Sequence, residues 1–256
     1  MSYTSWLHFL KFRSWSLDRE PRWLADSVIQ TVASLPSLSE FTINYSYRSE
    51  QYTSLHYLKN LTKLTVRSRC DNFREKIVPG IAQAIANSPD LKVLDVDSGQ
   101  WGNEGVTTLH DLFSDVESPL KLQHLGLARI GVGLDASILR HLQSLTSLEW
   151  MSTAFMKDDN YANSTEEVWH TLGTEGIKLS RLETNLMSDG LLQYLSSYQG
   201  LRDLRLQRVS GKDDNDSDRL ANIFFQEVLP RHANSLEIFH INAAFEGDWV
   251  SLPTLP

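Results

Sequence analysis

Apolar residues recur along this chain in units of the form L-x-x-h-x-h, where h is apolar in nearly every copy. Within a unit the last two h positions alternate with other residues, as in Leu64-Thr65-Val66, which is the period of a strand with one buried face. Each unit is therefore predicted to begin with a short strand. Nine copies occur, and they start at Leu7, Leu38, Leu61, Leu91, Leu122, Leu145, Leu179, Leu201 and Leu236.

Between these strands the apolar residues lie three and four positions apart, which is typical of a helix with one apolar stripe. Two examples are the sets Leu24, Val28, Val32, Leu35 and Leu220, Ile223, Phe224, Val228. Helix starts are indicated by Ser188 or Asp189 before one stripe and by Asp216 or Ser217 before another. Helix ends are indicated by Pro36, Pro89 and Pro230.

A single strand and helix cannot bury their own apolar faces, so neighbouring units must stack. We therefore expect an α/β fold, a curved solenoid of about nine irregular repeats with parallel strands on its concave face and helices on its convex face. Residues 1–256 are expected to form this single domain. Because the first unit starts at Leu7 and the chain stops soon after the ninth strand, terminal caps are expected to be missing.

The repeated units resemble the leucine-rich repeat, L-x-x-L-x-L-x-x-N/C, in the first six positions of this motif. They depart from it at the ninth position, where that family has asparagine or cysteine. The residues found there are Arg69, Gly99, Ile130, Thr153, Met187, Val209 and Ala244. The buried asparagine ladder of the family is therefore expected to be replaced or missing.

The last third of the chain is similar to the repeat region of mushroom-type fungal F-box proteins. The similarity lies in Leu182-Glu-Thr-Asn185, Leu191-Leu-Gln-Tyr-Leu-Ser-Ser-Tyr-Gln-Gly-Leu201, Ser217-Asp-Arg-Leu-Ala-Asn222, Val228-Leu-Pro-Arg-His-Ala-Asn-Ser-Leu236 and Phe245-Glu-Gly-Asp-Trp249. The resemblance implies a non-enzymatic protein-interaction module that recognises the substrate of a ubiquitin ligase. It implies a ligase adaptor as a second partner only if an F-box lies outside this chain, because none is visible in the sequence.

Composition and charge narrow the classes of partner. The 256 residues are 41% hydrophobic with a single cysteine, Cys70, so we expect a globular protein of a reducing compartment, cytoplasmic or nuclear. Lys and Arg number 24 against 32 Asp and Glu, and this net charge of −8 argues against nucleic acid. No run approaches the roughly 20 apolar residues of a membrane span, and the first residues lack the features of a secretion signal.

One alternative function is that of a dinucleotide-binding enzyme. Gly131-Val-Gly133-Leu-Asp-Ala136 matches G-x-G-x-x-A between a predicted strand and a predicted helix, and Glu149 follows as the candidate ribose ligand. The preceding strand alternates in polarity, however, and Asp135 would bring a negative charge to the pyrophosphate. Since no histidine spacing is typical of a metal site and no other catalytic motif occurs, we expect no enzyme, no cofactor and no metal.

The repeat pattern also predicts the side chains that face a partner, because residues between the inward leucines lie on the opposite face of the strands. The candidate protein-binding residues on this concave face are His124, Glu149, Met151, Glu183, Asn185, Arg205, Gln207 and His240. If the repeats stack in register, Thr65 lies beside Asp95 and Arg67 beside Asp97, so cross-strand pairs are expected. Self-assembly through uncapped ends is a further alternative.

A basic stretch surrounds Cys70 and consists of Lys59, Lys63, Arg67, Arg69, Arg74 and Lys76. Cations in this number could bind phosphate or an acidic peptide, and they could lower the pKa of the thiol. The acidic chain as a whole and the neighbouring Asp95 and Asp97 argue against nucleic acid as the ligand.

Overall fold

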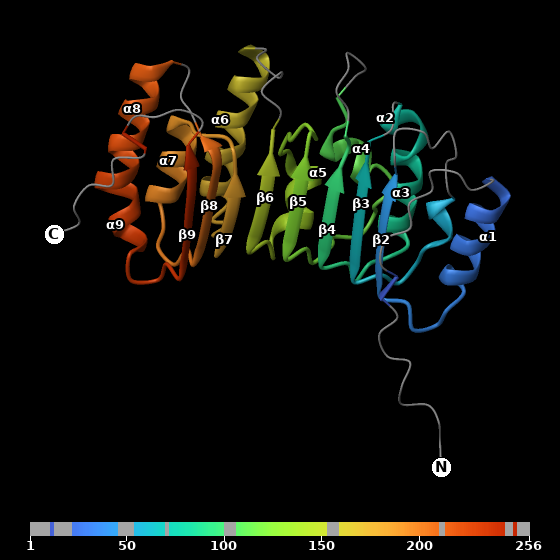
Figure 1. Cartoon of the computed structure of the whole chain (residues 1–256). Coiled ribbons are helices and arrows are strands. Elements are labelled where there is room, and N and C mark those ends of the chain that lie inside the picture. Colours follow the sequence, from blue (N-terminus) through green and yellow to red (C-terminus); the bar gives the residue numbers. More distant parts are fainter. Residues whose placement is uncertain are drawn as a thin grey trace. The chain divides into compact units, whose positions relative to one another are not determined.

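The computed structural model describes residues 11–12, 22–45, 54–69, 72–99, 106–152, 159–209, 213–243 and 248–249. The chain divides into two compact units, a first unit (Met1–Ser144) and a second unit (Leu145–Pro256), and each of them contains several of the strand-and-helix repeats. In each unit parallel strands alternate with helices, as predicted, and consecutive strands are neighbours in the sheet. In Figure 1 the strands of each unit lie toward the viewer and its helices lie behind or beside them.

The first unit contains the strands β1 to β5, which lie in that order. Its elements are β1 (Lys11–Phe12), α1 (Arg22–Ala33), β2 (Glu40–Tyr45), the 3₁₀ turn η1 (Leu55–Tyr57), β3 (Lys63–Ser68), α2 (Phe73–Lys76), α3 (Val78–Ala86), β4 (Val93–Asp97), α4 (Leu109–Phe113), β5 (His124–Ala128) and α5 (Ala136–Leu142).

The second unit contains the strands β6 to β9, again in chain order. Its elements are β6 (Ser147–Met151), α6 (Asp159–Thr174), β7 (Arg181–Thr184), α7 (Asp189–Ser196), β8 (Asp203–Val209), α8 (Asp214–Ile223), the π-helical turn η2 (Phe224–Val228), α9 (Leu229–His232) and β9 (Ile238–Ala243).

The strand register confirms the stacking predicted from the leucine positions. Leu64, Leu94 and Leu125 are direct neighbours across β3, β4 and β5, and all three are buried against the helix layer. In the second unit Leu148, Leu182 and Leu204 align in the same way. Each fully buried leucine side chain contributes about 2 kcal/mol of transfer free energy, so a shift of one residue in register would cost several kcal/mol per strand.

The first repeat departs from the predicted register. Its pattern places Phe12 beside Ile43, whereas the structure pairs Phe12 with Phe41, two residues earlier. Leu7 and Leu10, which define that repeat in the sequence, lie outside the described residues. A shift of two keeps the same face of the strand toward the helices, so the alternation of the pattern cannot distinguish the two registers.

The predicted start of α7 is confirmed, whereas that of α8 is wrong. The Ser188 side chain accepts from the Leu191 backbone N–H, as an N-cap residue does. Helix α8 begins at Asp214, and its N-cap is Asp213, which accepts from the Asp216 N–H, rather than Asp216 or Ser217. Asp213 caps the helix because its backbone is extended. Asp214 and Asp216, which follow it in the first turn, then stabilise the positive end of the helix dipole.

Pro36 and Pro89 follow the ends of α1 and α3, as predicted, but Pro230 lies within a continuous helical segment. It is close to the start of α9, directly after the π-helical turn η2. Proline lacks the N–H that an α-helix would bond one turn back, and the wider turn of η2 accommodates this missing bond. The helix therefore continues past the proline.

Side-chain hydroxyls and one amide replace the asparagine ladder at the carboxyl ends of the strands. Ser98 is fully buried and donates from Oγ to the Arg129 carbonyl at 2.9 Å. Thr184, equally buried, donates to the Trp150 carbonyl at 2.8 Å. Asn185 donates to the Ser152 carbonyl at 2.6 Å and accepts from its N–H at 2.8 Å. These bonds pair backbone groups at the carboxyl ends of the strands.

A second recurring bond fixes the turn before a strand. In each case a leucine backbone N–H just before the strand donates to a buried side chain. The four bonds are Leu61 to Ser88 Oγ (3.1 Å), Leu120 to His141 Nδ1 (3.1 Å), Leu179 to Tyr194 OH (3.2 Å) and Leu201 to His232 Nδ1 (3.4 Å). Each acceptor is buried and comes from a helix, or from the residues just after it, later in the same unit. Burial raises the pKa of Tyr194 to about 12. Burial first, and then the neighbouring Tyr194, raise the pKa of Tyr198 as well, so both phenols stay neutral.

Candidate binding surface

The candidate site is the sheet face that lies opposite the helices in each unit. Strands β4, β6 and β7 alternate between buried and half-buried residues, and the half-buried positions point away from the helix layer. In the second unit the central row of this face is Glu149, Glu183, Arg205 and His240, which are direct neighbours in register. The alignment of these four side chains was predicted from the repeat pattern and is confirmed.

Seven of the eight predicted binding residues belong to the second unit, and the contacts of four of them restrict what each side chain can do. Arg205 Nε donates to Asp203 Oδ1 at 3.0 Å, and Gln207 Nε2 donates to Glu183 Oε1 at 3.3 Å. The Asn185 amide is occupied by the Ser152 backbone. His240 lies on β9 and is exposed, while Met151 is half-buried at the end of β6. His240 is therefore the most accessible member of the predicted set, since the others are half-buried or buried.

Acidic and basic side chains lie close together on this part of the face. Glu149 and Glu183 are neighbours, about 4.8 Å apart between strands, an arrangement that repels unless cations lie close by. Arg181 lies 3.5 Å from Glu183 and 3.5 Å from Asp203. The hydrogen bond and charge of Asp203, followed by the charges of Glu183 and Glu149, raise the pKa of Arg205. Two arginines thus balance three carboxylates on adjoining strands.

In the first unit the predicted residue His124 is already paired. Its Nε2 lies 2.8 Å from Asp95 Oδ1, and the Thr65 hydroxyl donates to Asp95 Oδ2 at 3.1 Å, so the predicted Thr65–Asp95 pair is confirmed. Gly126 lies beside Asp95 in register, and a Cβ there would overlap the carboxylate. Burial raises the pKa of Asp95, but the bonds and charge of His124, with Thr65 and Lys63, lower it below its ordinary value.

The predicted pair between Arg67 and Asp97 is wrong. The two residues are neighbours in register, but Asp97 forms its ion pair with Arg129 and also accepts from the Gly99 N–H at 3.1 Å. Arg129 follows β5 directly and has a left-handed backbone with φ of 61°, which redirects its side chain across the sheet toward Asp97. The repeat pattern treats residue 129 as a loop position, so it carries no signal for this pair.

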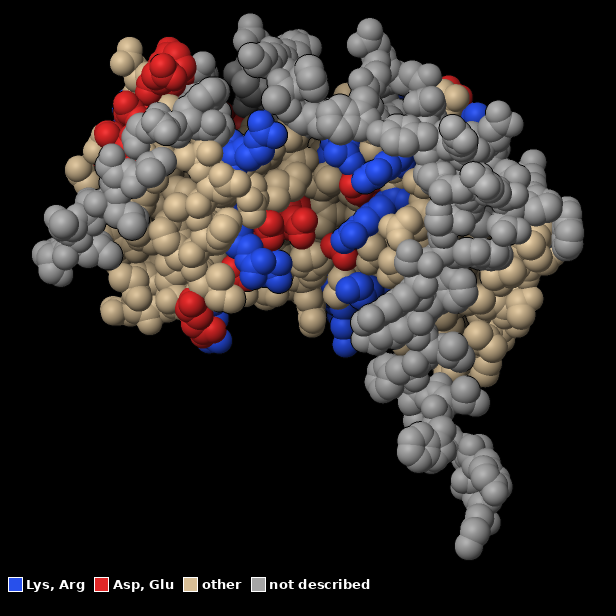
Figure 2. Space-filling view, in the orientation of Figure 1, with Lys and Arg blue, Asp and Glu red and all other residues tan. Residues whose placement is uncertain are grey.

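The basic stretch divides between two surfaces. Arg74 on α2 pairs with Asp111 on α4 at 3.0 Å, away from the strands. Lys63 and Arg67 lie on β3 and Arg69 follows it, at alternating positions that face away from the helices. Figure 2 shows lysine and arginine side chains gathered over β3 and β4, with acidic residues beside them. Cys70 lies outside the described residues.

The glycine motif of the dinucleotide alternative is used for backbone pairing. The Gly131 N–H donates to the Thr107 carbonyl at 2.7 Å, and the Gly131 carbonyl accepts from the Leu109 N–H at 3.0 Å. Asp135 caps α5 by accepting from Ser137 N and Ile138 N, and it also contacts His110 Nε2 at 2.8 Å. Hydrogen bonds from Ser137 first and then His110 lower the pKa of Asp135, so a carboxylate lies where a phosphate would bind. This geometry does not favour a dinucleotide.

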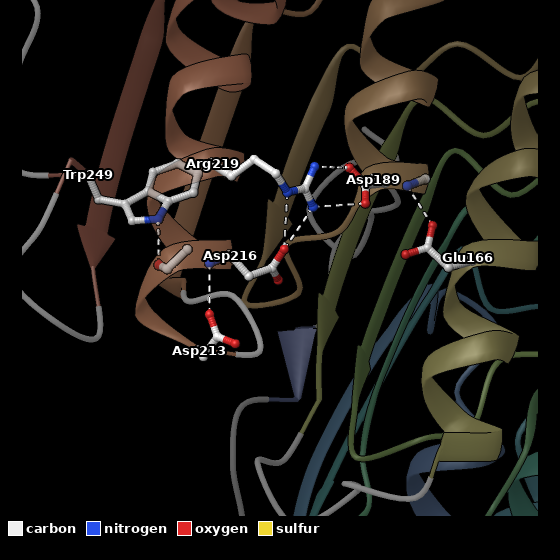
Figure 3. A network of polar contacts seen from close by, with 8 residues as sticks. Glu166, Asp189, Asp213, Asp216, Arg219 and Trp249 are labelled. Atoms are coloured by element: carbon white, nitrogen blue, oxygen red, sulfur yellow. Dashed lines mark hydrogen bonds and ion pairs between the residues drawn. The ribbon is translucent and has the colours of Figure 1, made fainter.

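A polar network that was not predicted from the sequence joins the starts of α7 and α8 to the middle of α6 (Figure 3). The Arg219 guanidinium contacts both carboxylate oxygens of Asp189 at 2.8 and 2.9 Å and Asp216 at 2.8 Å. Glu166 on α6 accepts from the Gly190 N–H at 2.5 Å. Trp249 Nε1 donates to Ser217 at 3.0 Å, and its ring packs on Phe224 and Phe225. Through these contacts Glu166, Asp189 and Asp216 connect α6, α7 and α8.

Within the ranges that the structure describes, no three His, Cys, Asp or Glu side chains come together as metal ligands. The described helices include none that is long and apolar enough to cross a bilayer. Comparisons with protein-family models, with curated proteins and with solved structures find no match to this chain.

Proposed function

We propose that this protein is a non-enzymatic protein-binding module, and that a partner protein binds the sheet face opposite the helices. The observation that carries the proposal is the registered row Glu149, Glu183, Arg205 and His240. Four side chains from four strands are aligned on one face, and they are charged or polar although apolar residues occupy the alternate positions. Such a row offers charge and hydrogen-bonding groups to a macromolecule without any backbone rearrangement.

Rigidity supports this assignment because a fixed surface loses little conformational entropy on binding. Three of the four strands under the row, β6, β7 and β8, have fully packed opposite faces, with Leu182, Leu204 and Trp150 at most 1% exposed, and β9 is half-buried on that face. Cross-strand bonds such as the one between Gln207 and Glu183 further hold the exposed side chains in position. Affinity would then come from complementarity of shape and charge to the partner.

The finer form of the proposal is that the repeats build a curved leucine-rich-repeat solenoid that recognises the substrate of an F-box-type ubiquitin ligase. The parallel strand-and-helix repeats with buried leucines support the repeat class. The ligase role rests on the resemblance of residues 182–249 to F-box repeat regions. The expected partner on the concave face is a protein, and a ligase adaptor joins only through an F-box outside this chain.

The test is photo-crosslinking from two positions in an extract of the source organism. A photoreactive amino acid replaces His240 on the sheet face or Glu175, which is exposed after α6. We expect a specific crosslinked protein from position 240 and none from position 175. The charge reversal Glu149→Lys with Arg205→Glu should abolish this product, because it inverts the charges on both sides of Glu183 in the row at constant net charge.

The matched control is Glu175→Lys with Lys178→Glu, which also reverses two exposed charges at constant net charge but lies away from the row. Both variants should keep the circular dichroism spectrum of the wild type. The proposal is contradicted if the control abolishes the crosslink while the sheet-face variant retains it. It is also contradicted if position 240 crosslinks to no protein.

A further inference from the structure

Three cations follow one another along β3 of the first unit, and we name Lys63, Arg67 and Arg69 the β3 basic strip. The ladder continues past the end of β3, since the Arg69 N–H donates to the Tyr45 carbonyl at 2.9 Å. Alternate residues of an extended chain face the same side, so all three side chains lie on the face opposite the helices. Arg67 and Arg69 are roughly 6.6 Å apart and the strip is about 20 Å long.

Two acids, Asp95 and Asp97, lie on the strand that follows the strip, and Glu40 lies beside Lys63 on the strand that precedes it. Asp95 is bound by His124 and by the Thr65 hydroxyl, with Lys63 contributing at longer range. Asp97 is bound by Arg129 and by the Gly99 N–H. Although Arg67 lies directly beside Asp97 in register, the carboxylate is directed to Arg129 instead. Asp95 and Asp97 are therefore bound without the participation of Arg67 or Arg69.

Arg67 and Arg69 are both exposed, and within the described residues neither guanidinium group has a hydrogen bond or an ion pair. This contrasts with Arg74, Arg129, Arg181, Arg205 and Arg219, all of which pair with carboxylates in the same chain. A guanidinium group presents a planar fork of donors that matches a carboxylate, so two adjacent open forks suit two acidic side chains.

We propose that the β3 basic strip binds an acidic, extended segment of a protein partner. This inference rests on the proposed function, because it assigns a chemistry to the partner of the sheet face. An extended segment repeats its side-chain direction at the same spacing as β3, so acids at alternate positions can oppose Arg67 and Arg69 together. Charge complementarity with two arginines that lack internal counterions is the basis for choosing this occupant.

Nucleic acid is a poorer match to the same strip. The strip offers only three cations, and the carboxylates of Asp95 and Asp97 lie on the adjoining strand. The chain as a whole carries a net charge of −8, which repels a long polyanion. A short acidic segment can contact the arginines without crossing the rest of the acidic surface.

The experiment is a fluorescence anisotropy titration of the full chain against a labelled peptide in which glutamate and serine alternate through sixteen residues. We expect saturable binding that weakens as NaCl is raised, because exposed charges are screened. The variant Arg67→Ala with Arg69→Ala should bind at least tenfold more weakly. Lys178→Ala with Arg231→Ala removes the same net charge from exposed positions of the second unit and should change the affinity less than twofold.

Two further probes define the specificity. A peptide in which glutamine replaces every glutamate should not bind, and a single-stranded DNA of sixteen nucleotides should bind more weakly than the acidic peptide. Equal losses in both alanine variants would overturn the proposal, since binding would then follow net charge alone. Equal or tighter binding of the DNA would also overturn it, in favour of a general polyanion surface.

The outcome is separable from that of the proposed function. Crosslinking from position 240 concerns the second unit, so it can succeed while the glutamate peptide fails to bind, and then only the assignment of an acidic segment is lost. Both alanine variants change exposed side chains and should retain the wild-type melting temperature. If the Arg67→Ala with Arg69→Ala variant melts at a lower temperature, the titration is repeated with Arg67→Gln combined with Arg69→Gln. This variant must show the same tenfold loss of affinity for the acidic peptide.

Discussion

Gly99 occupies a backbone position that other residue types cannot adopt without strain. Its φ is 61°, in the left-handed region, and a Cβ there would overlap the carbonyl group of Ser68 on the preceding repeat. The same residue donates its N–H to Asp97, whose carboxylate also binds Arg129. One glycine at the ninth repeat position thus permits two successive repeats to approach closely where the repeat family has an asparagine.

We predict that Gly99→Ala lowers the free energy of unfolding by at least about 2 kcal/mol, because left-handed strain adds to a clash with backbone atoms. The matched control is Gly176→Ala, since Gly176 has a similar φ of 68° but no atom close to its potential Cβ. The control should cost about 1 kcal/mol. Urea denaturation of both variants measures the difference, and equal losses would show that the contact with Ser68 contributes nothing.

Among the elements, the starts of α7 and α8 and the middle of α6 are joined by charged side chains rather than by apolar packing alone. Asp213 and Ser188 cap α8 and α7, and Arg219 then connects Asp189 at the start of α7 to Asp216 at the start of α8. Hydrogen bonds to Asp189 first and Asp216 second raise the pKa of Arg219, so it stays charged throughout the working pH range. Because the guanidinium is bidentate toward Asp189, its geometry is part of the connection.

We predict that Arg219→Ala lowers the melting temperature by on the order of 1–3 °C in 20 mM NaCl, and by less in 500 mM NaCl, where exposed ion pairs are screened. Arg219→Lys should recover only part of the loss, since lysine keeps the charge but not the fork. Arg202→Ala serves as the control, because its pair with Glu237 is long, at 3.8 Å, and mostly exposed. A loss that is the same at both salt concentrations would argue for packing rather than charge.

The strands and the face that each one buries were predictable because leucines such as Leu64, Leu94 and Leu125 recur at the same place in successive repeats. The register was predictable only up to a shift of two residues, and between β1 and β2 such a shift occurs. Side-chain pairs that lie within that periodicity, such as Thr65 and Asp95, were predictable for the same reason. The Arg129 and Asp97 pair was not, because it depends on a left-handed residue outside the repeat pattern. Nor was the contact between Arg219 and Asp189, which joins two helices thirty residues apart.

The same distinction applies to the candidate surface. Alternation along the strands determines which side chains face away from the helices, so the row from Glu149 to His240 could be predicted from the sequence alone. Which of them remain accessible could not be derived, since Asn185 is bound by Ser152 and His124 by Asp95. Those contacts depend on side-chain length and direction across neighbouring strands, which a hydrophobic pattern does not encode.

At the scale of the whole molecule, among the described residues each unit has one buried histidine, and this histidine holds a turn that precedes a strand. His232 is 1% exposed, accepts from the Leu201 N–H at Nδ1, and contacts the Leu195 carbonyl at 3.0 Å through Nε2, an arrangement that assigns the neutral Nε2–H tautomer. His141 accepts from the Leu120 N–H in the first unit. Burial is the main cause of the lowered pKa of both imidazoles, with Arg140 beside His141 and Arg231 beside His232 acting in the same direction.

These lowered pKa values predict that acid destabilises both units well above the range in which carboxylates titrate. Below pH 6.5 the unfolded chain binds protons at these two histidines that the folded chain does not, so the free energy of unfolding falls from about pH 6.5 downward and is unaffected by them above it. The lowered pKa of Asp95 acts in a separate window, where stability is lost only below about pH 4. Acid lability near pH 6 therefore reports on the histidines.

Substitution of His141 and His232 by asparagine should make the melting temperature nearly independent of pH between 7.5 and 5.5, because asparagine keeps an acceptor near the Nδ1 position but does not titrate. The wild type should melt at a lower temperature at pH 5.5 than at pH 7.5, and each single variant should show a smaller decrease. His240→Asn, at an exposed position of β9, should leave the decrease unchanged. If the melting temperature of the double variant decreases as much as that of the wild type, other groups control acid unfolding. The protonation of the two histidines that hold the turns would then not affect the free energy of unfolding.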